Sequence, residues 1–220
     1  MVLARIRAAE IRAGREPGSV TLIAVSKTFP ATAVAEAHRA GLRHFGESYA
    51  QEALSKRAEF DAPDIVWHFI GPIQSNKTRP IAAHFDWVHG IDRLRIASRL
   101  SEQRPVEMPP LNACIQVNIS GEASKSGVSL ADLPTLAAEI VGLARLRLRG
   151  LMAIPAPGLD DDEQRRAFRK VRDALLSLRE SGLDGLDTLS MGMSDDLEAA
   201  VGEGATMVRI GTAIFGSRAR

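Results

Sequence analysis

A lysine at the end of a buried strand is the first residue whose type and position suggest chemistry. Lys27 follows the apolar or small residues 22–26, and Phe29 and Pro30 come just after it. Such a run, ended by turn residues, predicts a strand buried on both faces, and ligands bind at the carboxyl ends of such strands. A partly desolvated amine there can attack carbonyl carbons, whereas an exposed one only extends its charge into water. Lys27 alone leaves both interpretations open.

Two later segments have the composition of anion-binding loops. In residues 190–194, Met193 and Ser194 precede an expected short helix, whose free N–H groups and dipole would attract an anion. Near the end of the chain, Gly211 permits close backbone approach and Thr212 offers a hydroxyl. Each loop also has a purely structural interpretation, as a helix cap or as a turn. Together they favour a phosphate site, because barrels bind phosphate after strands seven and eight.

Other polar residues are candidates for contacts with a ligand. Arg209 interrupts a mostly apolar strand, where it is either an ion-pair partner or a donor to a ring nitrogen. A guanidinium only donates hydrogen bonds, so it would leave that nitrogen unprotonated. Asn118 and Lys125 are candidates for the barrel mouth by position alone. Asp195 and Asp196 would repel a phosphate, and we expect them to face away and serve the first helical turn.

The histidines do not suggest a metal site. They stand at positions 38, 44, 68, 84 and 89, without ligand spacing on one helix face. His68 lies inside an expected strand, where a satisfied core residue is favoured over a catalyst.

Composition bounds the class of protein. The 220 residues are 45% hydrophobic and 25% charged, as in ordinary globular proteins, and the formal charge of +1 predicts neither a nucleic-acid nor a membrane partner. The only cysteine, Cys114, has no internal partner, which is typical of a reducing compartment. Charged residues interrupt residues 1–15, unlike a signal peptide, and no apolar run is long enough to span a bilayer. We therefore expect a cytoplasmic protein.

The elements that position these residues alternate along the chain. We expect a helix over 2–13, and caps at Ser48, Asp92 and Ser194 for three later helices. Pro80 should break or restart the helical stretch that opens at 74–77. The expected strands are 22–26, 42–46, 65–70, 85–91, 111–119, 146–154, 188–193 and 206–212. The other expected helices are 31–40, 48–60, 92–102, 130–144, 160–181 and 194–201.

Eight strands alternating with helices predict an α/β fold, a single (β/α)8 TIM barrel that spans residues 1–220 as one domain. No Asn-Gly hairpin signal joins two strands, and no GxGxxG motif follows the first strand, which argues against a dinucleotide-binding fold. The acidic residues 160–163 are assigned to the start of a long helix, whose dipole they favour.

An amine after strand one, phosphate loops after strands seven and eight, and an arginine on strand eight together suggest pyridoxal phosphate (PLP). At this point the sequence resembles the pyridoxal phosphate homeostasis proteins, the YggS/PROSC family, over nearly its whole length. The matching segments are AVSKT (24–28), HFGE (44–47), WHFIGPIQSNK (67–77), RGLMAI (149–154), MGMSD (191–195) and VRIGTAIFG (208–216).

The resemblance implies a barrel of the alanine racemase N-terminal-domain type and roles for several residues. Lys27 matches the lysine that forms an imine with the cofactor, and Arg209 matches the arginine that faces the pyridine nitrogen. Ser48 departs from the family pattern, which has asparagine before the tyrosine, so a cofactor contact there is in question. The expected cofactor-binding residues are Lys27, Asn118, Met193, Ser194, Arg209, Gly211 and Thr212.

The function implied is reversible binding of PLP through Lys27 in intracellular PLP homeostasis, without catalytic turnover. The expected partners are PLP and PLP-dependent apo-enzymes, and we expect a monomer. A weak amino-acid racemase is the alternative, although racemisation needs acid–base groups on both faces of the substrate and the sequence ends soon after Thr212, without the second domain that supplies one in alanine racemase. A lysine-imine aldolase, the third hypothesis, leaves Arg209 unexplained.

Overall fold

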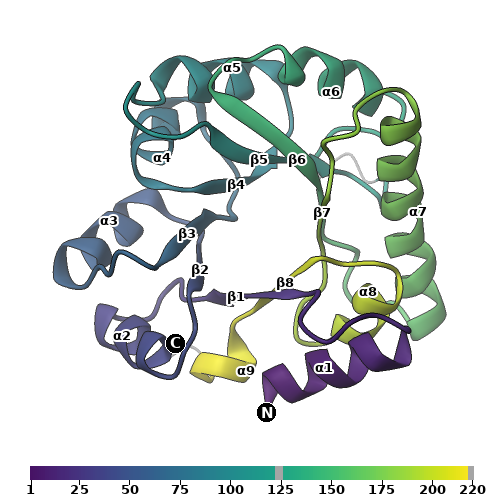
Figure 1. The fold of residues 1–220 in the computed structure, drawn as a ribbon, viewed down its shortest axis with the longest axis horizontal. Helices are drawn as coiled ribbons and strands as arrows, with labels where there is room; N and C mark the ends of the chain where they lie inside the picture. Colours follow the sequence, from purple (N-terminus) through teal and green to yellow (C-terminus); the bar gives the residue numbers. More distant parts are fainter. Residues whose placement is uncertain (122–125, 218–220) are drawn as a thin grey trace.

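The computed structural model describes residues 1–121 and 126–217. Its parallel strands pair in chain order and close into a barrel when β8 pairs with β1, as Figure 1 shows. This closure confirms the predicted barrel. The strands are β1 (Thr21–Val25), β2 (His44–Glu47), β3 (Val66–Phe69), β4 (Trp87–Ile91), β5 (Leu111–Val117), β6 (Leu146–Ala153), β7 (Thr188–Ser190) and β8 (Met207–Ile210).

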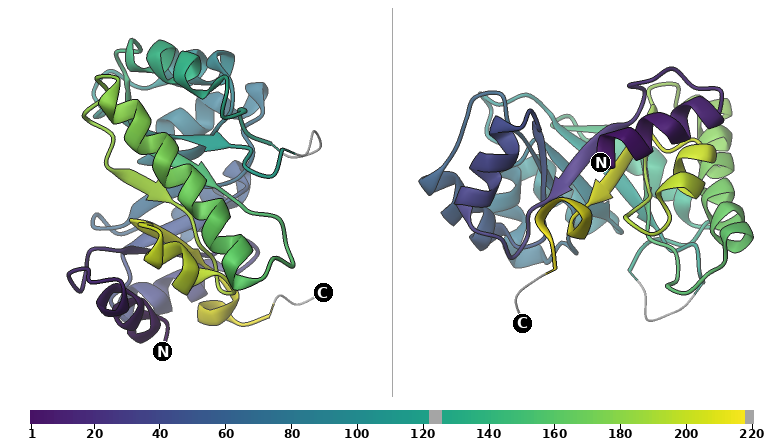
Figure 2. Two further views of the ribbon diagram at one scale, coloured as in Figure 1. Left: turned by 90° about the vertical axis from the view of Figure 1, so that its right-hand side faces the viewer. Right: turned by 90° about the horizontal axis from the view of Figure 1, so that it is seen from below.

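Helices surround the barrel (Figure 1). N-terminal helix α1 lies beside α8, where Arg5 pairs with Glu198 at 2.9 Å (Figure 2). In the described part of the chain, no helix combines the length and apolarity that crossing a membrane requires. The helices are α1 (Val2–Arg12), α2 (Ala31–Arg39), α3 (Ala50–Glu59), α4 (Thr78–His84), α5 (Leu94–Gln103), α6 (Leu133–Val141), α7 (Asp161–Glu180), α8 (Leu197–Gly202) and α9 (Thr212–Phe215), with a 3-10 turn η1 (Ser75–Lys77) before α4.

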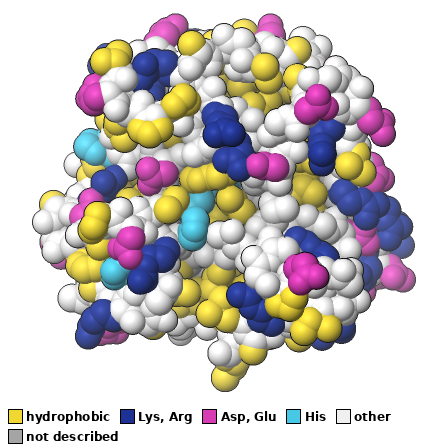
Figure 3. Space-filling view, viewed as in Figure 1, with side chains coloured by type: hydrophobic (Ala, Val, Ile, Leu, Met, Phe, Trp, Pro, Cys, Tyr) yellow, Lys and Arg dark blue, Asp and Glu magenta, His cyan; other side chains and the backbone are white. Residues whose placement is uncertain are grey.

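Charged side chains of both signs are scattered over the face that Figure 3 presents. Lys and Arg side chains are interspersed there with Asp and Glu over the surrounding helices. This mixture agrees with the formal net charge of +1.

Apolar side chains form two separate layers of core. The larger cluster fills the space between strands and helices and includes Phe45, Leu100 and Phe168. Because side chains alternate along a strand, the other face of each strand points into the barrel. The small interior cluster consists of Ile23, Trp87, Cys114, Met152 and Met207.

The three expected helix caps are wrong. Helix α3 begins at Ala50, with Tyr49 instead of Ser48 as its N-cap, so Ser48 lies outside the helix. The Asp92 carboxylate binds the Arg93 guanidinium at 2.7 Å, and Arg93 is the N-cap of α5. Helix α8 begins at Leu197 with Asp196 as its N-cap, which leaves Ser194 in the preceding loop. In each case the polar residue lies before the helix, but the helix begins later than a cap at that residue predicts.

Two further helix starts show why local patterns succeed or fail. Pro80 is the third residue of α4 and does not break it, because an N–H in the first turn has no intrahelical partner to lose. The acidic start of α7 is confirmed, since Asp160 and Glu163 form a reciprocal capping box. The expected last strand is shorter than predicted: β8 ends at Ile210, and the residues from Thr212 form α9.

Candidate functional site: a lysine-bearing cavity at the strand ends

A cavity of about 260 Å³ lies at the carboxyl ends of the strands. It is lined by Val25 of β1, by Arg209 of β8, and by residues from the loops that follow six of the strands. The structure therefore brings together six of the seven predicted contact residues. The lining residues are Val25, Lys27, Ser48, Ile70, Ile154, Met193, Ser194, Asp195, Arg209, Gly211 and Thr212.

The peptide groups on both sides of Lys27 are held by side chains from the β2–α3 region. Lys56 Nζ donates to the Ser26 carbonyl oxygen at 2.7 Å, and the Thr28 N–H donates to Glu52 Oε1 at 2.5 Å. Thr28 has a φ of 71°, a left-handed conformation that is uncommon for a β-branched residue. These bonds offset that strain and fix the direction in which the half-buried Lys27 side chain leaves the backbone.

A buried ion pair supports this arrangement. Lys56 Nζ lies 2.7 Å from Glu47 Oε1, and the side chains are 6% and 0% exposed. The Ser26 hydroxyl also donates to Glu47 Oε1 at 2.7 Å, while Oε2 has no partner within the described residues. Burial raises the pKa of Glu47, and the Lys56 ammonium acts in the opposite direction. Breaking this pair would leave a buried charge uncompensated.

The two aspartates of the loop after β7 are placed differently from the expectation. Asp196 is buried and accepts a 2.6 Å hydrogen bond from the Met193 N–H, so it shapes the loop from inside. Burial raises the pKa of Asp196, opposed by the Met193 N–H and by Arg209. Asp195 is exposed but lines the cavity, contrary to the expectation that it faces away. The Ser194 carbonyl accepts from Arg5 NH2 at 3.0 Å, which fixes this loop to α1.

Glycines let both loops approach their neighbours. Gly192 has a φ of +97°, and a Cβ there would lie 2.6 Å from the Ala200 Cβ. A Cβ on Gly211 would lie 3.2 Å from the Val25 carbonyl oxygen, at the end of β1. The loop that carries Thr212 therefore lies directly against the strand that carries Lys27.

Arg209 is buried and held by the backbone of two other strands. Its NH1 group donates to Ser190 O at 2.5 Å and to Ser190 Oγ at 2.9 Å, and NH2 donates to Ala153 O at 3.0 Å. Burial lowers the pKa of Arg209 to about 10, so the side chain is charged at neutral pH. Within the described residues it has no ion-pair partner. The structure thus differs from the ion-pair interpretation.

One predicted contact, Asn118, is not brought to the cavity. The Asn118 side chain is turned toward the loop after β5, where its Oδ1 accepts from Ser120 Oγ at 3.2 Å and from the Gly121 N–H at 3.1 Å. Asn118 is not among the residues that line the cavity. Its role as a cofactor contact stays a prediction. Lys125 lies outside the described residues.

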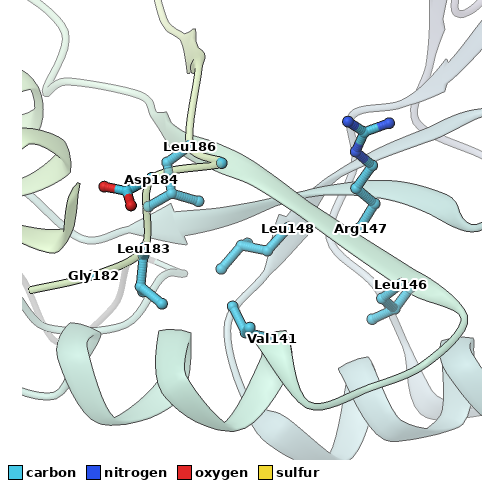
Figure 4. Close-up of a pocket in the computed structure, with 9 residues that line it drawn as sticks. Val141, Leu146, Arg147, Leu148, Gly182, Leu183, Asp184 and Leu186 are labelled. Carbon is cyan, nitrogen blue, oxygen red and sulfur yellow. The ribbon is translucent and has the colours of Figure 1, made fainter.

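The structure contains another cavity at the opposite end of the barrel (Figure 4). It has a volume of about 300 Å³ and lies between the end of α6, the start of β6 and the segment before β7. Figure 4 shows Val141, Leu148 and Leu183 pointing toward one another, while Arg147 points away. Barrels bind ligands at the other end, and this cavity gathers aliphatic side chains, so we do not assign a ligand to it.

The comparisons with known proteins agree with this geometry. The family model of the alanine racemase N-terminal domain matches residues 4–219. The pyridoxal phosphate homeostasis protein of Pseudomonas aeruginosa is 65% identical over 99% of this chain and 93% of its own length. The Escherichia coli protein of the same name is 57% identical over 97% of this chain and 92% of its own length. The chain belongs to the pyridoxal phosphate homeostasis protein family.

A solved family structure has the same fold. PipY from Synechococcus elongatus, in its structure with PLP bound, is 40% identical over 97% of this chain and all of its own, with a TM-score of 0.85. The resemblance drawn from the sequence is therefore confirmed, and so is the barrel fold.

Several site residues were missed by reasoning from the sequence. Ile70 and Ile154 add an apolar wall to the cavity, and each closes an expected strand. That position is a usable signal, since the residues at the ends of parallel strands line the mouth of a barrel. Lys56 and Glu52 gave no such signal, because their contacts to the Lys27 loop cross from a helix.

Proposed function

We propose that this protein binds pyridoxal 5′-phosphate in the cavity described above, holds it through Lys27, and serves PLP homeostasis without catalytic turnover. The observation that carries the proposal is that Lys27, Arg209 and the loops after β7 and β8 share one cavity. The PLP-bound structure of PipY, a family member of the same fold, supports it.

The lining fits each part of the cofactor. Ser194, Thr212 and nearby backbone N–H groups would hold the phosphate, and Ile70 and Ile154 offer apolar surface to the ring. The Lys27 amine would add to the aldehyde carbon with loss of water, which leaves a reversible imine. An incoming amine would displace the Lys27 amine from that carbon, which frees the lysine and transfers the cofactor to the incoming group.

The chemistry of Arg209 favours a protein that binds the cofactor over one that catalyses a reaction with it. Bound PLP withdraws electrons from an attached carbon, and it does so most strongly when its ring nitrogen is protonated. Arg209 keeps its protons at neutral pH, since its pKa is about 10, and can only donate a hydrogen bond to that nitrogen. The site therefore supplies a weak electron sink.

A weak or narrow amino-acid racemase is the second candidate. An unprotonated ring nitrogen suits proton exchange better than transamination, and Asp195 places a carboxylate at the cavity. Racemisation would need such an acid–base group opposite Lys27. A racemase assay of the loaded protein, with Asp195→Asn as comparison, separates this candidate from a pure carrier.

The cellular setting is part of the same proposal. The balanced charge and the only cysteine, Cys114, which is fully buried in β5, support a protein of the reducing cytoplasm. We expect it to act as a monomer and to deliver PLP to apo-enzymes.

The test is a titration with PLP followed by absorbance. The wild type should develop a visible imine band, Lys27→Ala should not, and Lys77→Ala, which removes an exposed lysine elsewhere, should match the wild type. A colourless wild type, or a band that survives in Lys27→Ala, would contradict the proposal. Turnover of an amino acid by the loaded protein would favour the racemase.

A further inference from the structure

Three histidines lie in a row through the interior of the barrel. His44 Nδ1 lies 2.9 Å from His68 Nε2, and His68 Nδ1 lies 2.9 Å from His89 Nε2. They come from the adjacent strands β2, β3 and β4. His68 and His89 are fully buried, and His44, the first residue of β2, is half-buried.

The row continues to the cofactor cavity through Ser190. His89 Nδ1 lies 2.8 Å from Ser190 Oγ, and Ser190 Oγ accepts from Arg209 NH1 at 2.9 Å. We call His44, His68, His89 and Ser190 the polar series. It connects the amino-terminal end of β2 with Arg209, which lines the cavity at the opposite end.

The series is not a metal site. Each ring nitrogen inside it faces one neighbouring ring or hydroxyl, so the nitrogens do not converge on a common point. Within the described residues, no group of three potential ligands is arranged to hold a metal ion.

Its surroundings keep the imidazoles neutral. Trp87, a member of the apolar interior cluster, stacks on His68 with ring centroids 5.7 Å apart. Burial lowers the pKa of His89 to about 3, with Arg209 acting in the same direction, and lowers that of His68 well below its ordinary value. Asp86 acts on the pKa of His44 in the opposite direction, but burial is the larger effect there too.

Because the imidazoles are neutral and the Arg209 guanidinium only donates, every hydrogen bond of the polar series has one direction. Arg209 can only donate, so Ser190 Oγ accepts from it and gives its own proton to His89 Nδ1. His89 must then donate from Nε2 to His68, and His68 from Nε2 to His44. The reverse direction would leave the Ser190 hydroxyl proton without an acceptor among its described contacts.

The series also determines what Arg209 offers to a ligand. Both NH1 hydrogens are used by Ser190, and one NH2 hydrogen is used by Ala153 O. Of the five N–H groups of a guanidinium, the Nε–H and one on NH2 remain without an acceptor among the described residues. These two are the donors that can point at a ring nitrogen.

We propose that the polar series is a one-directional hydrogen-bond relay that positions Arg209, so that the interior histidines control how tightly the ring of the cofactor is held. The relay rests on the proposed function only in taking PLP as the ligand that Arg209 contacts. Its members are positioning residues, because they act on the cofactor through Arg209.

The first test uses the wild-type protein without cofactor. Long-range ¹H–¹⁵N spectra of histidine-labelled protein should show His68 and His89 as neutral Nε2–H tautomers, unchanged as the pH falls through the ordinary histidine value of 6.5. In Ser190→Ala, which removes the source of direction, His89 should change to mixed tautomers. A protonated His89 or an Nδ1–H form in the wild type would overturn the relay.

The second test compares two nearly isosteric variants. His89→Asn keeps an oxygen that can accept from Ser190, whereas His89→Leu removes every acceptor. We expect His89→Leu to weaken PLP binding roughly tenfold and His89→Asn to stay within about threefold of the wild type. His84→Gln, outside the series, should bind as the wild type does. Circular dichroism verifies folding of each variant.

The outcomes separate the two proposals. Equal affinities for His89→Leu and His89→Asn would overturn the relay while leaving the cofactor site intact. A wild type that does not bind PLP would overturn the proposed function, and the tautomer spectra of the unloaded protein would still decide whether the relay exists.

Discussion

Lys56 Nζ lies 2.7 Å from the carbonyl oxygen of Ser26, the residue directly before Lys27. The same ammonium lies 2.7 Å from Glu47 Oε1, so the backbone beside Lys27 is tied to a buried ion pair between β2 and α3. The lysine that we assign to the cofactor thus leaves the barrel from a fixed point.

Breaking the buried pair should destabilise the fold. In Lys56→Met, Glu47 keeps a buried carboxylate without its cation, and we expect the free energy of unfolding to fall by about 3 kcal/mol. Urea denaturation measures this. The double variant Glu47→Leu/Lys56→Met removes both charges and should recover most of the loss. A single variant as stable as the wild type would contradict the role of the pair.

Stability should also fall in acid because of the interior histidines. Unfolded His89 takes up a proton near pH 6.5, whereas the folded protein accepts it only near the lowered pKa of about 3. The stabilisation is therefore fully present above pH 6.5 and is lost as the pH falls toward 3. Urea denaturation across this range should show a shallower pH dependence for His89→Asn. An identical dependence in both proteins would show that His89 titrates normally.

The phosphate should be held by the loop after β8. Thr212→Val removes a hydroxyl without changing the shape of the side chain, and we expect PLP affinity to fall roughly tenfold, as for a hydrogen bond to a charged group. Pyridoxal, which has no phosphate, serves as the matched ligand, and its affinity should not change. Equal losses for both ligands would place Thr212 elsewhere in the site.

Ser48 allows a test in which a substitution should increase the affinity for PLP. It lines the cavity at the position where the resemblance expects asparagine. Ser48→Asn supplies an amide, and we expect PLP affinity to rise about threefold, the value of one ordinary hydrogen bond. A titration beside the conservative Ser48→Ala measures the change. Weaker binding by the asparagine variant would show that the cavity has adapted to the shorter side chain.

Local sequence signals predicted the order of the elements and most of the cavity. The apolar run before Lys27 and the small residues near Ser194 and Gly211 marked the ends of strands, and parallel strands bring their ends together. Helix starts were harder, because Ser48 and Asp92 are residue types that favour the N-cap, yet the N-caps are the next residues, Tyr49 and Arg93.

The spacing of the histidines in the sequence could not predict that they contact one another. His44 and His68 are 24 residues apart, and His68 and His89 are 21 apart, distances that suggest nothing on one helix or strand. The strand register places Gly46 opposite His68. His44 is two residues before Gly46, so it lies on the same face of the sheet and beside His68. That register depends on the closed barrel, so the polar series becomes visible only in three dimensions.

The central claim is that Lys27 holds the cofactor covalently. We would load the protein with PLP, reduce it with borohydride and map the modified lysine by peptide mass spectrometry, with Lys27→Ala treated identically. The account predicts a phosphopyridoxyl group on Lys27 in the wild type and none on the corresponding peptide of the variant. Modification spread over surface lysines, with Lys27 left unmodified, would contradict it.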